Sequence, residues 1–153
     1  MADFSSYLSV DMADVPKTVP SLPGGHYFAT VSGWKTAERN YDKATGGPPT
    51  PVVEISFRVT SADEDVDTTL LPAGGGAGKI LTKDYRLNDP DRTGQVMLRR
   101  LAEETCGLPV KGYDLESLLD ALKGSEVKVF NVPRPGQEEG QFFPNVTKVL
   151  PAQ

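Results

Sequence analysis

Polar and apolar residues alternate along several short stretches of this chain, and that spacing predicts half-buried β-strands. The clearest stretch is residues 52–60, where every second residue from Val53 to Val59 is apolar and those between are polar or charged. Residues 26–35 alternate in the same way, with Val31 on the expected core side. Less regular stretches complete a set of five predicted strands, at residues 26–35, 52–60, 79–87, 126–132 and 141–150.

Between the third and fourth predicted strands, apolar residues recur at the spacing of a helix. Residues 92–106 form the first predicted helix, and residues 115–123 form the second. Asp114 is a suitable N-cap for the second helix, and Gly124 is a suitable stop. The predicted order is therefore three strands, a helical insert and two further strands.

That order of elements is typical of the OB-fold, which holds oligonucleotides or oligosaccharides on one face of its barrel. We predict a mainly β protein, a five-stranded OB-fold-like barrel with a helical insert between strands 3 and 4. A generic β-sandwich with a helix would share the order and is the alternative fold. Residues 1–23 are expected to form a flexible arm, residues 24–150 the OB-fold-like domain, and residues 151–153 the C-terminal end.

Charge gives two opposing indications about a nucleic-acid partner. The 153-residue chain has a formal net charge of −5, whereas nucleic-acid-binding domains are usually basic. The charges are unevenly distributed, however, because residues 79–100 contain six basic and three acidic side chains. A local basic face on an acidic protein is therefore compatible with the sequence.

The expected compartment is the cytosol, with no membrane partner. Residues 1–7 have neither the basic nor the apolar stretch of a signal peptide, and no apolar run approaches the roughly 20 residues of a membrane span. Cys106 is the only cysteine, which excludes an internal disulfide.

Stretches that resemble catalytic or metal-binding motifs fail on their details. The glycine-rich residues 73–79 are followed by Ile80, where a P-loop needs Ser or Thr, and they lead into a strand instead of a helix. The acidic loop at residues 63–67 lacks the glycine and the final glutamate of a calcium loop. His26 and Cys106 are each the only residue of their kind, which is too few for a zinc site. We therefore expect neither an enzyme nor a metal ion or other cofactor.

Aromatic residues next to basic residues are the main functional signal. Proteins bind single strands by stacking bases on aromatic rings while Lys and Arg follow the phosphates. Trp34 and Tyr41 are the residues expected to stack bases, although Trp34 also suits the end of a barrel and Tyr85 also suits a core. The candidate nucleic-acid-binding residues are Trp34, Lys35, Arg39, Tyr41, Lys43, Arg58, Lys83, Tyr85, Arg86, Phe130 and Arg134.

A layout of apolar and glycine positions runs through most of the chain. It comprises LPGGHY at residues 22–27 leading into 29–31, the stretch 51–60, MLRRL at 97–101, residues 119–124 leading into 127–129, and Asn-Val at 145–146. In this layout the chain resembles the small OB-fold single-stranded-DNA-binding proteins from replication and recombination modules of tailed phages, over about residues 20–150. The resemblance implies coating of single-stranded DNA in the bacterial host cytoplasm, with little sequence preference and no cofactor.

One difference from that family concerns its partners. Many such proteins end in an acidic tail that recruits partner proteins, whereas residues 141–153 contain no Asp or Glu. The sequence leaves open whether the chain forms a homo-oligomer and which phage replication or recombination proteins it contacts. If a DNA groove exists, loop 36–49 should become ordered on binding, and the acidic loop at residues 63–67 should lie away from the groove.

The main functional alternative is a small β-barrel structural phage protein, such as a capsid-decoration or tail component. The acidic pI and the proline-containing arm suit that alternative equally well. An adaptor or inhibitor of a host protein would leave no readable signature.

Overall fold

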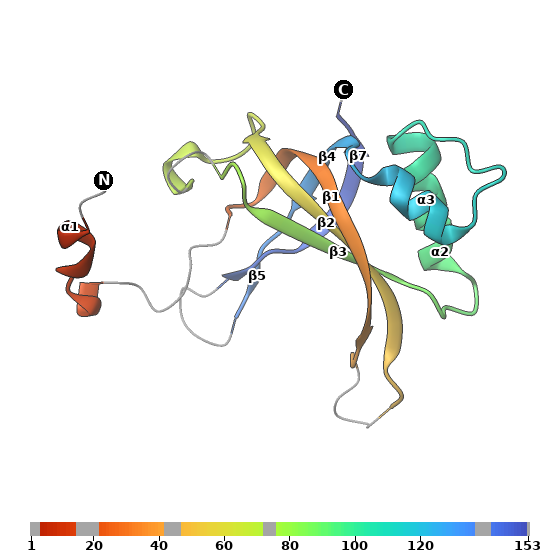
Figure 1. Cartoon of the computed structure of the whole chain (residues 1–153), viewed down its shortest axis with the longest axis horizontal. Coiled ribbons are helices and arrows are strands. Elements are labelled where there is room, and N and C mark those ends of the chain that lie inside the picture. The colour runs from red at the N-terminus through yellow and green to blue at the C-terminus, as the bar shows by residue number, and fades with distance from the viewer. Residues whose placement is uncertain (1–3, 15–21, 42–46, 72–75, 137–141, 153) are drawn as a thin grey trace.

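A computed structural model describes residues 4–14, 22–41, 47–71, 76–136 and 142–152 of the chain. Its centre is a strongly twisted, antiparallel five-stranded sheet in the order β3-β2-β1-β4-β7 (Figure 1). The strands are β1 (Gly25–Arg39), β2 (Thr50–Ala62), β3 (Ile80–Arg86), β4 (Glu126–Asn131) and β7 (Val146–Pro151). Each of the five predicted strands thus has a counterpart, and two helices lie between β3 and β4 as predicted.

Several shorter elements complete the described part of the chain. They are α1 (Ser5–Leu8), η1 (Met12–Asp14), η2 (Thr68–Leu70), β5 (Arg134–Pro135) and β6 (Phe142–Phe143). The last two form a separate two-stranded ribbon between β4 and β7. Within the described ranges, no helix combines the length and the apolar character needed to cross a lipid bilayer.

Burial follows the predicted period of two in β1 at residues 27–31 and in β2 from Ile55 to Val59, but Val52 and Glu54, on the other face of β2, are buried as well. In β1, Tyr27, Ala29 and Val31 are buried, and in β2 every second residue from Val53 to Val59 is buried. The two strands pair in antiparallel register, so these apolar side chains meet on the same face of the sheet. This shared apolar face forms the core of the protein.

β1 is longer than the sequence predicts, and it belongs to two ladders. It pairs with β2 along most of its length, and residues 25–30 also pair with β4 on the other side. The prediction ended this strand at residue 35 and placed a polar loop at 36–49. Residues 36–39 instead continue the ladder, because the backbone of β2 offers them cross-strand hydrogen bonds that outweigh their polar composition. The correction places Arg39 on the sheet.

The helical insert covers one end of the curved sheet (Figure 1). It consists of α2 (Thr93–Arg100), a π-helical turn η3 (Leu101–Thr105) that continues α2, and α3 (Leu115–Leu122). The predicted N-cap is confirmed, because the Asp114 carboxylate accepts a hydrogen bond from the Ser117 backbone N–H at 2.8 Å. The insert adds to the core the buried side chains of Leu98, Leu101, Ala102, Leu118, Leu119 and Leu122.

The predicted barrel does not close. β3 and β7 are the two edges of the sheet, and no ladder joins them in the described residues. A side chain bridges them instead, because Lys83 Nζ donates a hydrogen bond to the carbonyl oxygen of Val146 at 3.3 Å.

The open edge follows from the way in which the predicted fifth strand is divided. Residues 141–150 were expected to form one strand, but Phe142–Phe143 pair with β5, and β7 begins only at Val146. Pro144 has no N–H to donate to a ladder, and the N–H of Asn145 donates to the side chain of the buried Asn131 at 2.9 Å. The segment before Val146 therefore forms no ladder with β3 among the described residues.

Candidate nucleic-acid interface

A cleft of about 500 Å³ lies between the β3 edge and the segment that leads into β7. Arg39, Tyr41, Lys83, Arg86 and Arg134 are among the residues that line it. These are five of the eleven candidate residues, so the structure gathers side chains that lie far apart in sequence. The opening between the two unpaired edges is the space that a closed barrel would have filled with a ladder.

Strand register determines which side chains reach this cleft. Lys35 of β1 pairs with Glu54 of β2, and Glu54 pairs with Asp84 of β3, so the three share one row across the outer face of the sheet. Arg39, at the end of β1, extends its guanidinium back over this row. The outer face beside the cleft is therefore polar and charged, and the core lies on the opposite face of the same strands.

Tyr41 and Arg86 form a stacked pair at the cleft. The guanidinium carbon of Arg86 lies 4.4 Å from the centroid of the Tyr41 ring, a cation–π distance. The Tyr41 hydroxyl donates a hydrogen bond to Asp84 at 3.2 Å. Partial burial, followed by the nearby Asp84 carboxylate, raises the pKa of the Tyr41 phenol, which stays a neutral donor. The residue is still 50% exposed, so ring surface remains open to a ligand.

Arg39 is held by two carboxylates. Its Nη2 lies 2.6 Å from Glu54 Oε2, and its Nε lies 3.0 Å from Asp84 Oδ2. Lys35 Nζ lies 3.6 Å from the same Glu54 oxygen. The hydrogen bonds to Asp84 and then to Glu54 raise the pKa of the Arg39 guanidinium above its usual value. These four residues, which we call the charge quartet, have no net charge when ionised.

The remaining cations of the cleft are Lys83, Arg86 and Arg134. Lys83 is half-buried, and burial lowers the pKa of its ammonium group, which contacts the Val146 carbonyl. Arg134 is exposed on β5 and pairs with Phe143 across the ribbon. Since the quartet is neutral, these three side chains give the cleft its positive charge.

Several candidate residues lie elsewhere. Trp34 faces away from Lys35 and the outer face, packs against the core and donates its indole N–H to Asp120 of α3 at 2.9 Å. Tyr85 is buried in the core. Arg58 is exposed on β2, where it pairs with Ile80 of β3, one same-face position beyond the pair that contains Thr82. It does not line the cleft.

Phe130 lies on the outer face of β4, where its ring centroid is 4.5 Å from that of His26. This position is in the other half of the sheet, next to β7. Lys43 lies outside the described residues.

The sequence interpretation missed two exposed aromatic residues beside the cleft. Phe142 and Phe143 of β6 are 49% and 52% exposed, and Phe143 pairs with Arg134. Two adjacent aromatic residues directly before Pro144 were the available signal. They were assigned to a continuous fifth strand, in which one of the two would have faced the core.

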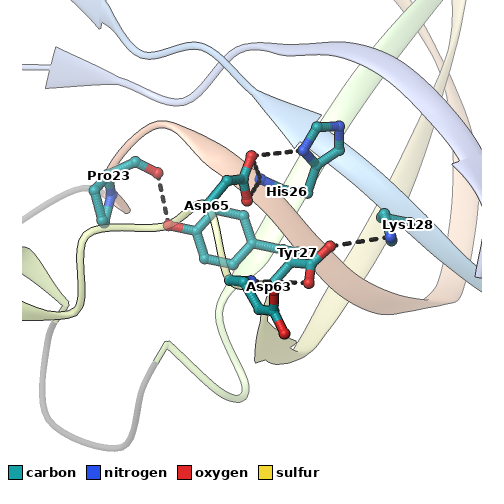
Figure 2. Close-up of polar contacts among 7 residues, drawn as sticks. Pro23, His26, Tyr27, Asp63, Asp65 and Lys128 are labelled. Atoms are coloured by element: carbon teal, nitrogen blue, oxygen red, sulfur yellow. Dashed lines mark hydrogen bonds and ion pairs between the residues drawn. The ribbon is translucent and has the colours of Figure 1, made fainter.

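The acidic loop after β2 contacts the first residues of β1 (Figure 2), and Arg39 lies at the other end of that strand. His26 Nδ1 lies 2.7 Å from Asp65 Oδ2, and the His26 backbone N–H donates to the same carboxylate at 3.0 Å. Lys128 Nζ lies 3.0 Å from Asp63 Oδ2. At about 3.3 Å per residue, roughly 40 Å of strand separates His26 from Arg39.

The described residues contain no group of three or more His, Cys, Asp or Glu side chains placed to hold a metal ion.

No protein-family model matches this chain, and no curated protein shows significant sequence similarity to it.

Proposed function

We propose that the protein binds and coats single-stranded DNA, with little sequence specificity, during phage DNA replication and recombination. The observation that carries the proposal is the Tyr41–Arg86 pair, a half-exposed aromatic ring backed by a guanidinium at the cleft. Base stacking on aromatic rings combined with a basic groove is how proteins hold single strands without reading their sequence. Arg86 covers part of the ring, and the exposed remainder is the surface on which a base would stack.

The second support is local charge. Lys83, Arg86 and Arg134 line the cleft and give it positive charge that the neutral quartet does not balance. The chain as a whole has a net charge of −5. A cleft with a surplus of cations attracts a polyanion even when the protein is acidic, because salt screens charges more than about 8–10 Å away. The acidic loop that binds His26 and Lys128 lies well beyond that distance along β1.

The third support is the position of the cleft relative to the topology. An OB-fold binds oligonucleotides on the face around strands 2 and 3, between the loop that joins strands 1 and 2 and the loop that joins strands 4 and 5. Here the cleft lies between Tyr41, which follows β1, and the β5–β6 ribbon, which joins β4 to β7. We infer an OB-fold whose barrel is open between β3 and β7, with that opening as the entrance for DNA.

The exposed Phe142 and Phe143 favour a single strand over a duplex. Phe143 pairs with Arg134 across the ribbon, and Phe142 pairs with Pro135. Both rings are about half exposed and can contact unpaired bases, whereas duplex bases are already stacked on each other. The proposal therefore includes these two residues among the groups that contact bases.

A direct test compares the binding of labelled oligo-dT and of a duplex of equal length, each at low and at moderate salt. We expect tight, salt-sensitive binding of oligo-dT and much weaker binding of the duplex. Absence of oligo-dT binding at low salt would overturn the proposal and favour the structural phage protein. Equal binding of both ligands would show an unspecific polyanion site instead.

A further inference from the structure

The charge quartet contains an arrangement that a sheet normally avoids. Glu54 and Asp84 are direct cross-strand neighbours on the outer face, and like charges in that position destabilise a sheet. Arg39 compensates by contacting both carboxylates, one through Nη2 and the other through Nε. The three side chains therefore depend on each other as long as no ligand is bound.

The two carboxylates do not hold Arg39 equally. Glu54 is 11% exposed at its side chain and contacts Arg39 at 2.6 Å. Asp84 is 27% exposed, and its oxygens lie at 3.0 and 3.5 Å from Arg39. The shortest contact is with the more buried carboxylate, whereas Asp84 makes two longer hydrogen bonds from a more exposed position. Glu54 is therefore the less accessible partner, and Asp84 is the one that a competing anion can reach and replace.

Asp84 also faces the cleft. It lines the same cavity as Arg39, Lys83 and Arg86, and it accepts the hydrogen bond of the Tyr41 hydroxyl. A phosphate entering the cleft would therefore meet a carboxylate that already occupies the guanidinium. A negative charge at that position repels the incoming phosphate and competes with it for the same donors.

From these contacts we infer that Asp84 occupies a phosphate position in the ligand-free protein, and that a backbone phosphate binds Arg39 by displacing the Asp84 carboxylate. This inference rests on the proposed function and adds a regulation to the same site. Asp84 weakens binding, and it keeps Arg39 from acting as a full phosphate contact. Glu54 stays in place and keeps the guanidinium oriented toward the cleft.

The test is the variant Asp84→Asn, which removes the charge but keeps an oxygen that can accept the Tyr41 hydrogen bond. We expect its affinity for labelled oligo-dT to rise roughly three- to tenfold, as for the loss of a repulsive charge at the edge of an interface. The slope of log affinity against log salt should steepen by about 0.7, because the site then has one more net positive charge with which to neutralise phosphate.

Two further variants separate displacement from a general change in net charge. Asp89→Asn removes one negative charge from the loop after β3. Among the described residues, the Asp89 carboxylate contacts neither Arg39 nor Tyr41. This variant should therefore change the affinity for oligo-dT by less than about twofold. Arg39→Gln combined with Asp84→Asn should abolish both the gain in affinity and the steeper slope. Circular dichroism and thermal unfolding of each variant verify folding.

The outcomes distinguish this inference from the proposed function. If the parent binds oligo-dT and Asp84→Asn binds no more tightly, or if the gain persists without Arg39, the displacement of Asp84 is wrong and the proposed function stands. If only Asp84→Asn binds, the parent fails the test of the proposed function, and the inference that rests on that function fails with it. If neither protein binds at low salt, the proposed function fails, and the inference fails with it.

Discussion

Arg86, the last residue of β3, holds its guanidinium 4.4 Å from the ring of Tyr41, which follows the end of β1. The contact joins two strands that are not neighbours in the sheet, because β2 lies between them. It also holds an aromatic ring that lies two residues beyond the end of β1.

Replacing Tyr41 with Ala should weaken oligo-dT binding by roughly ten- to a hundredfold, since stacking is worth about 1–3 kcal/mol per base. Tyr41→Phe keeps the ring and should retain most of the affinity. Tyr113→Ala is the matched control, because Tyr113 is 46% exposed in the loop before α3 and does not line the cleft. A Tyr41→Ala protein that folds and binds like the parent would place the stacking surface elsewhere.

Arg134→Ala should change the salt dependence of binding. Arg134 is an exposed cation of the cleft, and the loss of one phosphate contact should reduce the slope of log affinity against log salt by about 0.7. Arg99→Ala is the control, because Arg99 is exposed on α2 and pairs with Glu103 of η3. Affinities measured across a salt series decide the question, and equal slopes for both variants would contradict the prediction.

Trp34 should contribute to stability and not to DNA binding. Its ring packs against the core and its N–H binds Asp120, so Trp34→Ala should lower the free energy of unfolding by about 2–4 kcal/mol. Trp34→Phe should cost less, because it loses mainly the hydrogen bond, about 1 kcal/mol. Urea unfolding followed by circular dichroism measures both values. A folded Trp34→Ala protein with strongly reduced oligo-dT affinity would return Trp34 to the interface.

Gly94 should not tolerate a side chain. A Cβ at this position would lie 1.8 Å from the carbonyl oxygen of Arg86, so Gly94→Ala should force α2 away from β3. We expect a loss of about 1–3 kcal/mol or more, as for other overpacked sites. Gly33→Ala in β1 is the control, since a Cβ there would meet no atom within 4 Å in the described structure. Equal melting temperatures of the two variants would contradict the close approach.

The loop that binds His26 should make stability depend on pH in the acid range. The hydrogen bond from the His26 backbone N–H, with a smaller effect from its side chain, lowers the pKa of Asp65 below 3.8. A lowered carboxyl pKa stabilises the fold above the unfolded-state pKa, and this contribution is lost as pH falls through the folded-state pKa. Asp65→Asn should therefore lower the melting temperature at pH 7, and the difference from the parent should shrink near pH 3. A difference that is constant with pH would exclude this origin.

The sequence predicts those parts of the fold that depend on local pattern. The alternation around Val53–Val59 identifies β2 and its buried face, and Asp114 identifies the start of α3, because each signal is contained within a few neighbouring residues. The end of β1 and the division of the fifth strand were not predictable in this way. Residues 36–39 are polar except for Ala37 and become strand only because β2 pairs with them. Phe142–Phe143 leave the sheet only because β5 offers a partner.

The candidate site shows the same division between local and distant information. Composition correctly identifies basic and aromatic residues near β3, but it does not show that Arg39 is neutralised by Glu54 and Asp84, which lie on two other strands. Nor does it distinguish Trp34, which faces the core, from its neighbour Lys35, which faces the cleft side. Both distinctions depend on register, which one sequence does not contain.

The double pairing of β1 affects how the chain folds during its synthesis. The partner strand β2 follows β1 at once, but β4 begins only at Glu126, after β3 and both helices have been made. At about 5–20 residues per second, a ribosome needs on the order of 10 s to reach it. Throughout that interval, the backbone groups of residues 25–30 form an unpaired edge of a nascent hairpin, and neighbouring nascent chains on the same messenger carry the same edge.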